Sequence, residues 1–423
     1  MAALAETAAE RGVGLEFFDP PQCPFFSYPL GSPSPYFEQA AVLLRSLAEA
    51  GCLDLPHYAA SVFAAFRPGY GGYRDRSTKN FLRRYAAGSL PPLTGSTDDQ
   101  ANAFARLPAL VALHAGAERG ELLASVERMI RVTQNDPVAV AYGTAAALIL
   151  EAVVQGASVA AAVACTVDWL QQPATQKGQQ AEQQAGQQQA DVAAVEPVSA
   201  ALWGDVAARL LQAAELAPLT PLEGATQLGR NCHLPNSLQT PLQVVLHLEY
   251  RQAQQTQQRQ QQQQGQAQQQ QRQQIAGQQT EQLLGDHQEE QVAALPGGQQ
   301  GNGPASAASA DDAGGDFCLP CSMGACPLPG SPAERSAAAG RRVLAAILEQ
   351  QRAGSAAQLP PEAFVEGVRL AIRPGGCCAS RAGFVGALLG ARGVQLPADW
   401  EGRALGYEEV RAQAERLAQL RDN

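Results

Sequence analysis

Residues 375–391 combine paired glycines, adjacent cysteines and a run of small and apolar residues, G-G-C-C-A-S-R-A-G-F-V-G-A-L-L-G-A. Gly375 and Gly376 follow a proline, so the backbone can turn with positive φ where a new helix must begin. Ser380 and Arg381 then fall in the first turn of that helix, where free amides and the positive end of the helix dipole favour anions. The segment therefore predicts a helix that starts at a sharp turn, with a candidate binding site at the turn.

Three small residues recur at every fourth position of this segment: Ala382, Gly386 and Gly390. A glycine inside a helix costs about 0.5–1 kcal/mol relative to alanine. The stripe therefore predicts that another backbone packs closely against the helix.

The rest of the chain also favours helices. Val138–Val154 and Ser158–Val167 are long enough together to suggest a membrane span, but Glu151 interrupts the first segment and Gly156 separates the two. The pair Asp136-Pro137 is typical of the start of a helix in a water-soluble domain, with a capping residue followed by proline at the first helical position. We expect two buried core helices and no membrane span.

Glutamine-rich tracts divide this helical pattern. Such tracts bury too little apolar surface to offset an ordering cost of roughly 1–2 kcal/mol per residue, so we expect disorder or isolated weak helix. The predicted organisation is one helical domain over residues 17–423, with disordered insertions at residues 171–191 and 251–335.

Composition narrows the class of partner. The net charge is −10 and the basic residues are scattered, which argues against a nucleic-acid groove. The first residues lack the basic-then-apolar order of a secretory signal, and the nine cysteines are spread widely. These features favour a reducing compartment, and we expect an intracellular, cytoplasmic protein.

A loop of small residues at 95–99 ends in two adjacent acids, Asp98 and Asp99, before an apolar helix. Either Thr97 or Asp98 can cap that helix, which accounts for one acid. The second acid needs another role, and lining a cleft is the alternative.

Two cysteine patterns suggest metal binding only weakly. Cys232-His233 lacks further ligands nearby, so a packed cysteine and a hydrogen-bonded histidine are favoured. Cys318, Cys321 and Cys326 supply three of the four ligands that structural zinc needs, and free thiols are favoured there.

Residues 375–391 resemble the C-terminal signature of the ADP-ribosylglycohydrolase family, G-G-D-T-D-T-T-A-A-I-A-G-A-L-x-G-A. In that register Cys377 and Ala379 stand in place of two aspartates, Cys378 in place of a threonine, and Ser380 in place of the next threonine. Within the family the chain is most similar to the branch of J-type crystallins and selenoprotein J, with R-V-T-Q-N-D and C-H-L-P-N-S as further likenesses.

The resemblance implies an all-α fold, a single compact orthogonal helical bundle, and a cleft that takes an ADP-ribose-like ligand or an ADP-ribosylated protein. The family's T-D-D-T motif, which holds magnesium, is matched here by residues 37–40, where only Glu38 is a carboxylate. The implied catalytic candidates are Glu38, Asp98 and Asp99. The implied substrate-binding residues are Asn102, Arg106, Gly375, Gly376 and Ser380. Glu38 and Ser380 are what remains of the magnesium site, because a thiol is a poor magnesium ligand.

Three functions stay open at this point. The chain binds or hydrolyses an ADP-ribosyl ligand with a degenerate magnesium site, or it is a catalytically inactive crystallin-like protein with a structural or ligand-binding role. The third alternative is thiol redox chemistry at Cys377 and Cys378, because a helix N-terminus lowers the pKa of a thiol.

Overall fold

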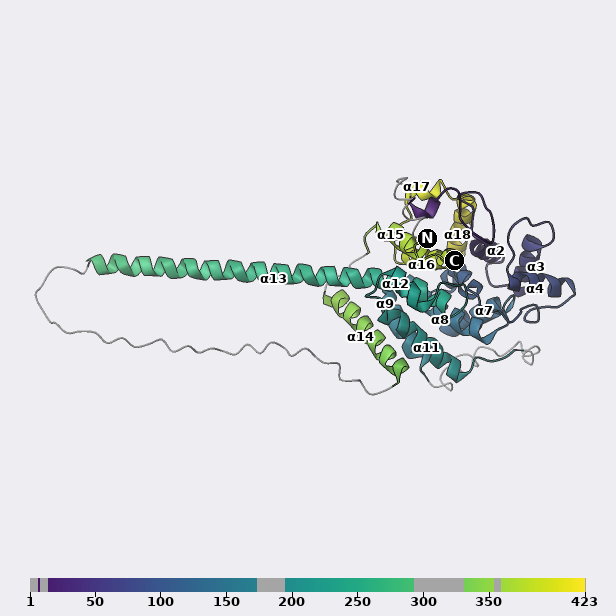
Figure 1. The fold of residues 1–423 in the computed structure, drawn as a ribbon, viewed down its shortest axis with the longest axis horizontal. Helices are drawn as coiled ribbons and strands as arrows, with labels where there is room; N and C mark the ends of the chain where they lie inside the picture. The colour runs from purple at the N-terminus through teal and green to yellow at the C-terminus, as the bar shows by residue number, and fades with distance from the viewer. Residues whose placement is uncertain (1–6, 8–13, 173–194, 293–330, 354–358, 423) are drawn as a thin grey trace, which may run out of the picture. The chain divides into compact units, whose positions relative to one another are not determined.

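The computed structural model describes residues 7, 14–172, 195–292, 331–353 and 359–422. Within these ranges the regular structure is helical, with no strand, and an isolated antiparallel bridge joins Gln100 to His233. The predicted all-α fold is confirmed (Figure 1).

The helices follow one another in chain order with short connections. They are η1 (Leu15–Phe17), α2 (Pro35–Ala50), α3 (Leu55–Phe66), α4 (Arg76–Ala86), α5 (Asn102–Ala105), α6 (Leu107–His114), α7 (Arg119–Arg131), α8 (Pro137–Val154), α9 (Val159–Leu170), α11 (Ala200–Glu215), α12 (Pro221–Leu228), α13 (Asn236–Val292), α14 (Pro332–Ala353), α15 (Ala363–Ile372), α16 (Cys378–Ala391), α17 (Ala398–Glu401) and α18 (Tyr407–Asp422).

Many helices begin where a side chain caps free amides. Asp136 caps α8 ahead of Pro137, as the sequence predicted, and Ser158 caps α9. Ser34 caps α2 in the same way by accepting from the amide of Phe37 at 3.2 Å. These caps fix the direction in which each helix enters the bundle.

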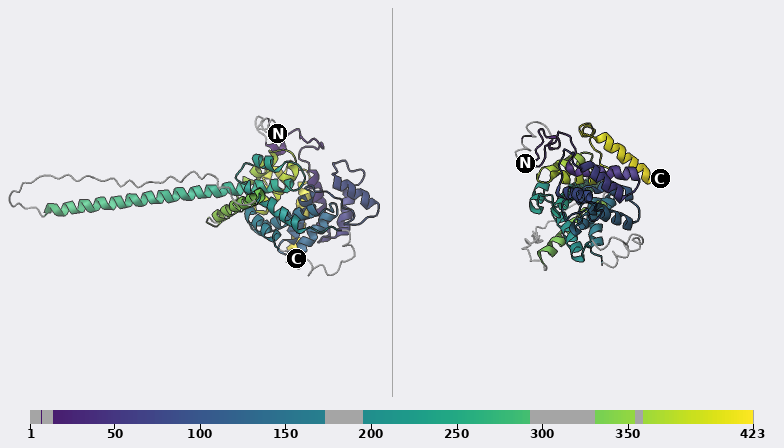
Figure 2. Two further views of the ribbon diagram at one scale, coloured as in Figure 1. Left: turned by 60° about the horizontal axis from the view of Figure 1, so that its bottom comes forward. Right: turned by 90° about the vertical axis from the view of Figure 1, so that its right-hand side faces the viewer.

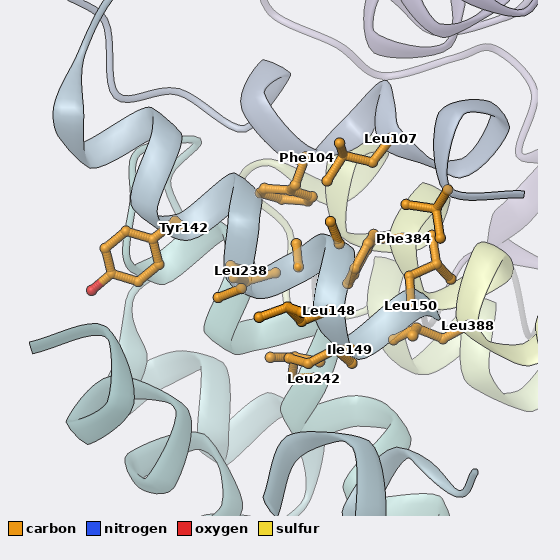
Figure 3. Packing of buried hydrophobic residues seen from close by; sticks show 14 of the residues in the cluster. Phe104, Leu107, Tyr142, Leu148, Ile149, Leu150, Leu238, Leu242, Phe384 and Leu388 are labelled. Atoms are coloured by element: carbon orange, nitrogen blue, oxygen red, sulfur yellow. The ribbon is translucent and has the colours of Figure 1, made fainter. Parts of the chain in front are cut away.

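Helix α8 lies at the centre of the core and contacts α5, α6, α7, α9, α11 and α16. Its side chains Leu148, Ile149 and Leu150 pack among Phe104 of α5 and Phe384 of α16 (Figure 3). The two phenylalanine rings meet edge to face with centroids 5.1 Å apart. The packing confirms α8 and α9 as core helices.

By length and composition, α8 is the one helix in the described ranges that could cross a membrane. Its most apolar stretch is 78% buried inside the bundle, as expected of a core helix. The C-terminal helix α18 lies against α2 on the outside of this core, as the turned views of Figure 2 show.

The chain divides into two compact units, one made of Met1–Gln254 with Ser331–Asn423 and the other of Gln255–Gly330. The boundary falls inside α13, which continues as helix through the glutamine-rich tract to Val292. Isolated helix was one of the two states expected for this tract. The insertion predicted at residues 171–191 lies almost entirely outside the described residues, as do Cys318, Cys321 and Cys326.

The small-residue stripe of α16 does not meet another backbone, so that prediction is wrong. A β-carbon added at Gly390 would have nothing within 4 Å, and one at Gly386 would have only the Phe364 ring, at 3.6 Å. Helix α16 instead packs through its larger residues, Phe384, Val385 and Leu388, which are buried. The side opposite these residues carries the glycines.

Candidate functional site

Four segments distant in sequence meet at one place: the first turn of α2, the loop 95–101, the loop 229–235 and the turn 374–377. Backbone hydrogen bonds hold the three loops together. The amide of Ala101 donates to the carbonyl of Cys232 at 2.9 Å, and the amide of Cys377 donates to the carbonyl of Arg230 at 2.7 Å. The loop 229–235 thus joins the acidic loop to the start of α16.

The turn before α16 depends on its two glycines. Gly375 and Gly376 have φ of 74° and 66°, in the left-handed region that the sequence predicted. A β-carbon at Gly376 would lie 2.0 Å from the carbonyl oxygen of Arg230. This close approach lets the Cys377 amide reach that same oxygen, so both the conformation and the space require glycine.

Arg381 supports the turn from inside the protein. It is 1% exposed, and its guanidinium donates to the carbonyls of Ala371 and Gly375 and to the hydroxyl of Thr240. Arg381 therefore holds the turn in place, and its hydrogen-bonding groups are directed away from the surface.

The side chain of Cys377 is surrounded by hydrogen-bonding groups. Its sulfur lies 3.3 Å from the Tyr36 hydroxyl and 2.9 Å from the Ser380 hydroxyl, and the Cys232 thiol is also hydrogen-bonded to it. The bond from Cys232, together with those from Ser380 and Tyr36, outweighs burial and lowers the pKa of the Cys377 thiol to about 6. The neighbouring Cys378 differs, because burial raises the pKa of its thiol.

A second polar cluster, which the sequence did not reveal, centres on Asp75. This buried carboxylate accepts from the side-chain amides of Gln39 at 2.6 Å and Asn102 at 2.7 Å. It also accepts from the Ser77 hydroxyl and from the Thr78 amide, which makes it the cap of α4. Asp75 ties α2, α4 and α5 together, and its acceptor sites are used within the protein.

The two acids of the 95–99 loop lie in different surroundings. Asp98 is buried and accepts from the amide of Gln100 at 3.0 Å, and burial, with Asp75 and Asp99 nearby, raises its pKa. Asp99 is partly exposed and lies 2.6 Å from Nδ1 of His233. The prediction that Thr97 or Asp98 caps the next helix is wrong, because α5 begins three residues after Asp99 without a side-chain cap.

Glu38 points away from this cluster. Its carboxylate accepts hydrogen bonds from the hydroxyls of Tyr28 at 3.2 Å and Tyr70 at 2.5 Å. Tyr36 and Gln39 stand three positions apart, on one side of α2, whereas Glu38 lies between them in sequence and faces elsewhere. Tyr36, rather than Glu38, is therefore the α2 residue that contacts the start of α16.

Arg106 is also turned inward. It is 1% exposed, and it donates to the Tyr58 hydroxyl, to the Gln134 side chain and to the backbone carbonyl of Asn102. These bonds hold the short helix α5 and, with it, the Asn102 amide in the Asp75 cluster.

A cavity of about 500 Å³ adjoins the Cys377 cluster, with Tyr36 and Ser380 in its wall. It lies between α2, α5, α6, α16 and α18, and its lining is mostly alanine with a few larger apolar residues. A second cavity, of about 340 Å³, lies on the other side of α2 and includes Glu38 and Tyr70. Only the larger one is continuous with the residues around Cys377.

Comparison with known families agrees with this architecture. The chain matches the model of the ADP-ribosylglycohydrolase family over residues 4–230, which is more than half of its length. The chain belongs to the ADP-ribosylglycohydrolase family. No curated protein matches it closely.

The family match covers α2 to α12 and the loops that carry Asp98, Asp99 and Asn102, while the C-terminal signature lies outside it. It begins at residue 4, before the start at Phe17 that the sequence suggested. The further likeness to the J-type crystallins and selenoprotein J is not addressed by this match and stays a prediction.

The residues that replace the family's aspartates are poorly suited to magnesium. Magnesium prefers several hard oxygen ligands in octahedral geometry, whereas Cys377 offers sulfur and Ala379 offers no ligand atom. Glu38 is bonded to two tyrosines, and Ser380 is bonded to Cys377. Within the described ranges no three His, Cys, Asp or Glu side chains are grouped as a metal site.

Proposed function

We propose that this member of the ADP-ribosylglycohydrolase family binds an ADP-ribosyl group, free or attached to a protein, at the starts of α2 and α16 without magnesium. One observation carries the proposal. Tyr36 and Cys377 are 341 residues apart, yet their side chains are in contact at 3.3 Å. The two segments between which the resemblance places the ions thus still meet, but through a phenol and a thiol.

The surroundings of this contact suit the parts of such a ligand. The cavity of about 500 Å³ is within the usual size of a small-molecule pocket, and its apolar lining would accept a flat base. Asp99 and His233 at the rim would bond ribose hydroxyls. The start of α16 carries the positive end of a helix dipole, which favours the diphosphate.

Hydrolysis by the family's two-metal route requires converging, free carboxylates. Asp75 is fully engaged with Gln39, Asn102 and the start of α4. Asp98 has a raised pKa, which favours the uncharged acid over a metal ligand. Asp99 is paired with His233, so the site holds no set of carboxylates free to bind two ions.

Calorimetric titration of the protein with ADP-ribose tests the binding proposal. We expect saturable heat that weakens in Tyr36→Phe and Ser380→Ala, because each substitution removes a hydroxyl at the site. Tyr85→Phe is the matched control, because Tyr85 stacks on Phe81, outside the cavity lining, and should bind like the wild type.

Absence of heat at millimolar ADP-ribose would overturn the proposal and favour the inactive, structural crystallin-like alternative. Magnesium-dependent release of ADP-ribose from a modified protein, lost in Glu38→Ala, would contradict the metal-free part and restore the hydrolase with a degenerate magnesium site.

A further inference from the structure

The cluster at the start of α16 brings two thiols together from distant parts of the chain. Cys232 lies in the loop 229–235 and Cys377 caps α16, and the thiol of Cys232 is hydrogen-bonded to the sulfur of Cys377. Both cysteines are free. Closing an S–H···S contact to a disulfide of about 2.05 Å needs a local movement of side chains and loop, because the two sulfurs already face each other.

The backbone around the pair is firmly held. The Cys377 amide donates to the carbonyl of Arg230, two residues before Cys232, and the Cys232 carbonyl accepts from the amide of Ala101. Glycine at position 376 allows this close approach. The contact between the two thiols therefore belongs to the folded loops and does not depend on a chance rotamer.

The environment distinguishes Cys377 from the other thiol beside it. The hydroxyls of Tyr36 and Ser380 lie against the Cys377 sulfur, and the sulfur sits at a helix N-terminus, which stabilises the thiolate. Cys378 follows directly, but the recorded side-chain hydrogen bonds to sulfur all involve Cys377 and Cys232. Cys377 is thus the attacking sulfur and Cys232 is the thiol positioned to resolve it.

We propose that Cys232 and Cys377 are a hydroperoxide-sensitive thiol pair, in which Cys377 is oxidised first and Cys232 then forms a disulfide with it. The Cys377 thiolate attacks one oxygen of the peroxide, the O–O bond breaks, and the departing hydroxide takes a proton to become water. The Cys232 sulfur then attacks the sulfenic sulfur, the S–O bond breaks, and the Cys232 proton leaves with the second water. Two thiols and one hydrogen peroxide thus yield one disulfide and two waters.

This pairing differs from the adjacent Cys377–Cys378 pair that the sequence suggested. The disulfide would fasten the loop 229–235 to the turn before α16 and remove the bond between Cys377 and Tyr36. It would therefore change the wall of the cavity of about 500 Å³ that Tyr36 and Ser380 line. The inference stands independently of the ligand proposed above, because it concerns the two sulfurs alone.

The test is to treat the full-length protein with graded hydrogen peroxide, block the remaining thiols, digest without reduction and map disulfides by mass spectrometry. We expect a Cys232–Cys377 cross-link as the first product, reversed by dithiothreitol. Cys232→Ser keeps a hydroxyl donor at the same place and should trap Cys377 as a sulfenic acid that dimedone labels. Cys165→Ser, at an exposed cysteine of α9, is the matched control and should leave the cross-link unchanged.

Formation of a Cys377–Cys378 disulfide first, or of disulfides among Cys318, Cys321 and Cys326 with Cys232 still free, would overturn the proposal. Equal dimedone labelling of Cys377 in the wild type and in Cys232→Ser would also overturn it, because Cys232 would then not resolve the sulfenic acid. Circular dichroism of both variants separates these outcomes from a failure to fold.

Discussion

Replacement of Asp75 by alanine tests the buried cluster that positions the first turn of α2. The substitution removes the cap of α4, which is worth about 1 kcal/mol. It also takes away the carboxylate acceptor of the Gln39 side-chain amide, and a buried donor without a partner costs about 1–3 kcal/mol. Asn102 loses one of two acceptors but keeps its bond to Gln39 at 2.9 Å. We expect a loss of about 3–4 kcal/mol in the free energy of unfolding.

The assay is urea denaturation followed by circular dichroism, with Asp54→Ala as the control. Asp54 caps α3 by accepting from the amide of His57 at 2.9 Å, but it is exposed and supports no buried amide. Its loss should cost only about 1 kcal/mol. Equal destabilisation by the two substitutions would refute the reasoning, because Asp75 would then be no more than a helix cap.

Three further predictions follow from the same region. Gly376→Ala should cost roughly 2 kcal/mol or more in stability, because its φ is 66° and the new methyl would meet the carbonyl of Arg230, whereas Gly390→Ala, in open space within α16, should slightly stabilise the protein in thermal melts. The alkylation rate of Cys377 by iodoacetamide should rise with pH through about 6, since the lowered pKa leaves the thiolate dominant above that value; a rise only near 9 would contradict the hydrogen-bonded cluster. Asp98→Asn should be more stable relative to wild type at pH 7 than at pH 4, because a raised pKa means that the folded state loses stability as the buried carboxyl ionises; a difference independent of pH in urea titrations would show that Asp98 ionises freely.

The all-helical fold could be predicted because helical periodicity and caps are local signals. Asp136 followed by Pro137 marked the start of α8, and the paired glycines marked the turn before α16. The small-residue stripe of α16 misled because the sequence shows which face is bare but not what lies opposite it. Gly390 has open space there.

The candidate site was only partly predictable. Asp75 had a visible capping pattern, but its partners Gln39 and Asn102 come from two other helices, and no local signal connects them. The choice between Tyr36 and Glu38 depended on the rotation of α2, since neighbouring positions on a helix point about 100° apart. The contact between Cys232 and Cys377 joins segments that only the folded chain brings together.

The most direct test of the account is the affinity of the wild-type protein for ADP-ribose, measured by calorimetry in EDTA and again in millimolar magnesium. The account predicts the same dissociation constant in both, because Tyr36, Cys377 and Ser380 bond to one another where the family resemblance places the ions. Binding that appears only with magnesium, or that strengthens about tenfold or more with it, would contradict the central claim, since about 1.4 kcal/mol of binding free energy would then come from the metal.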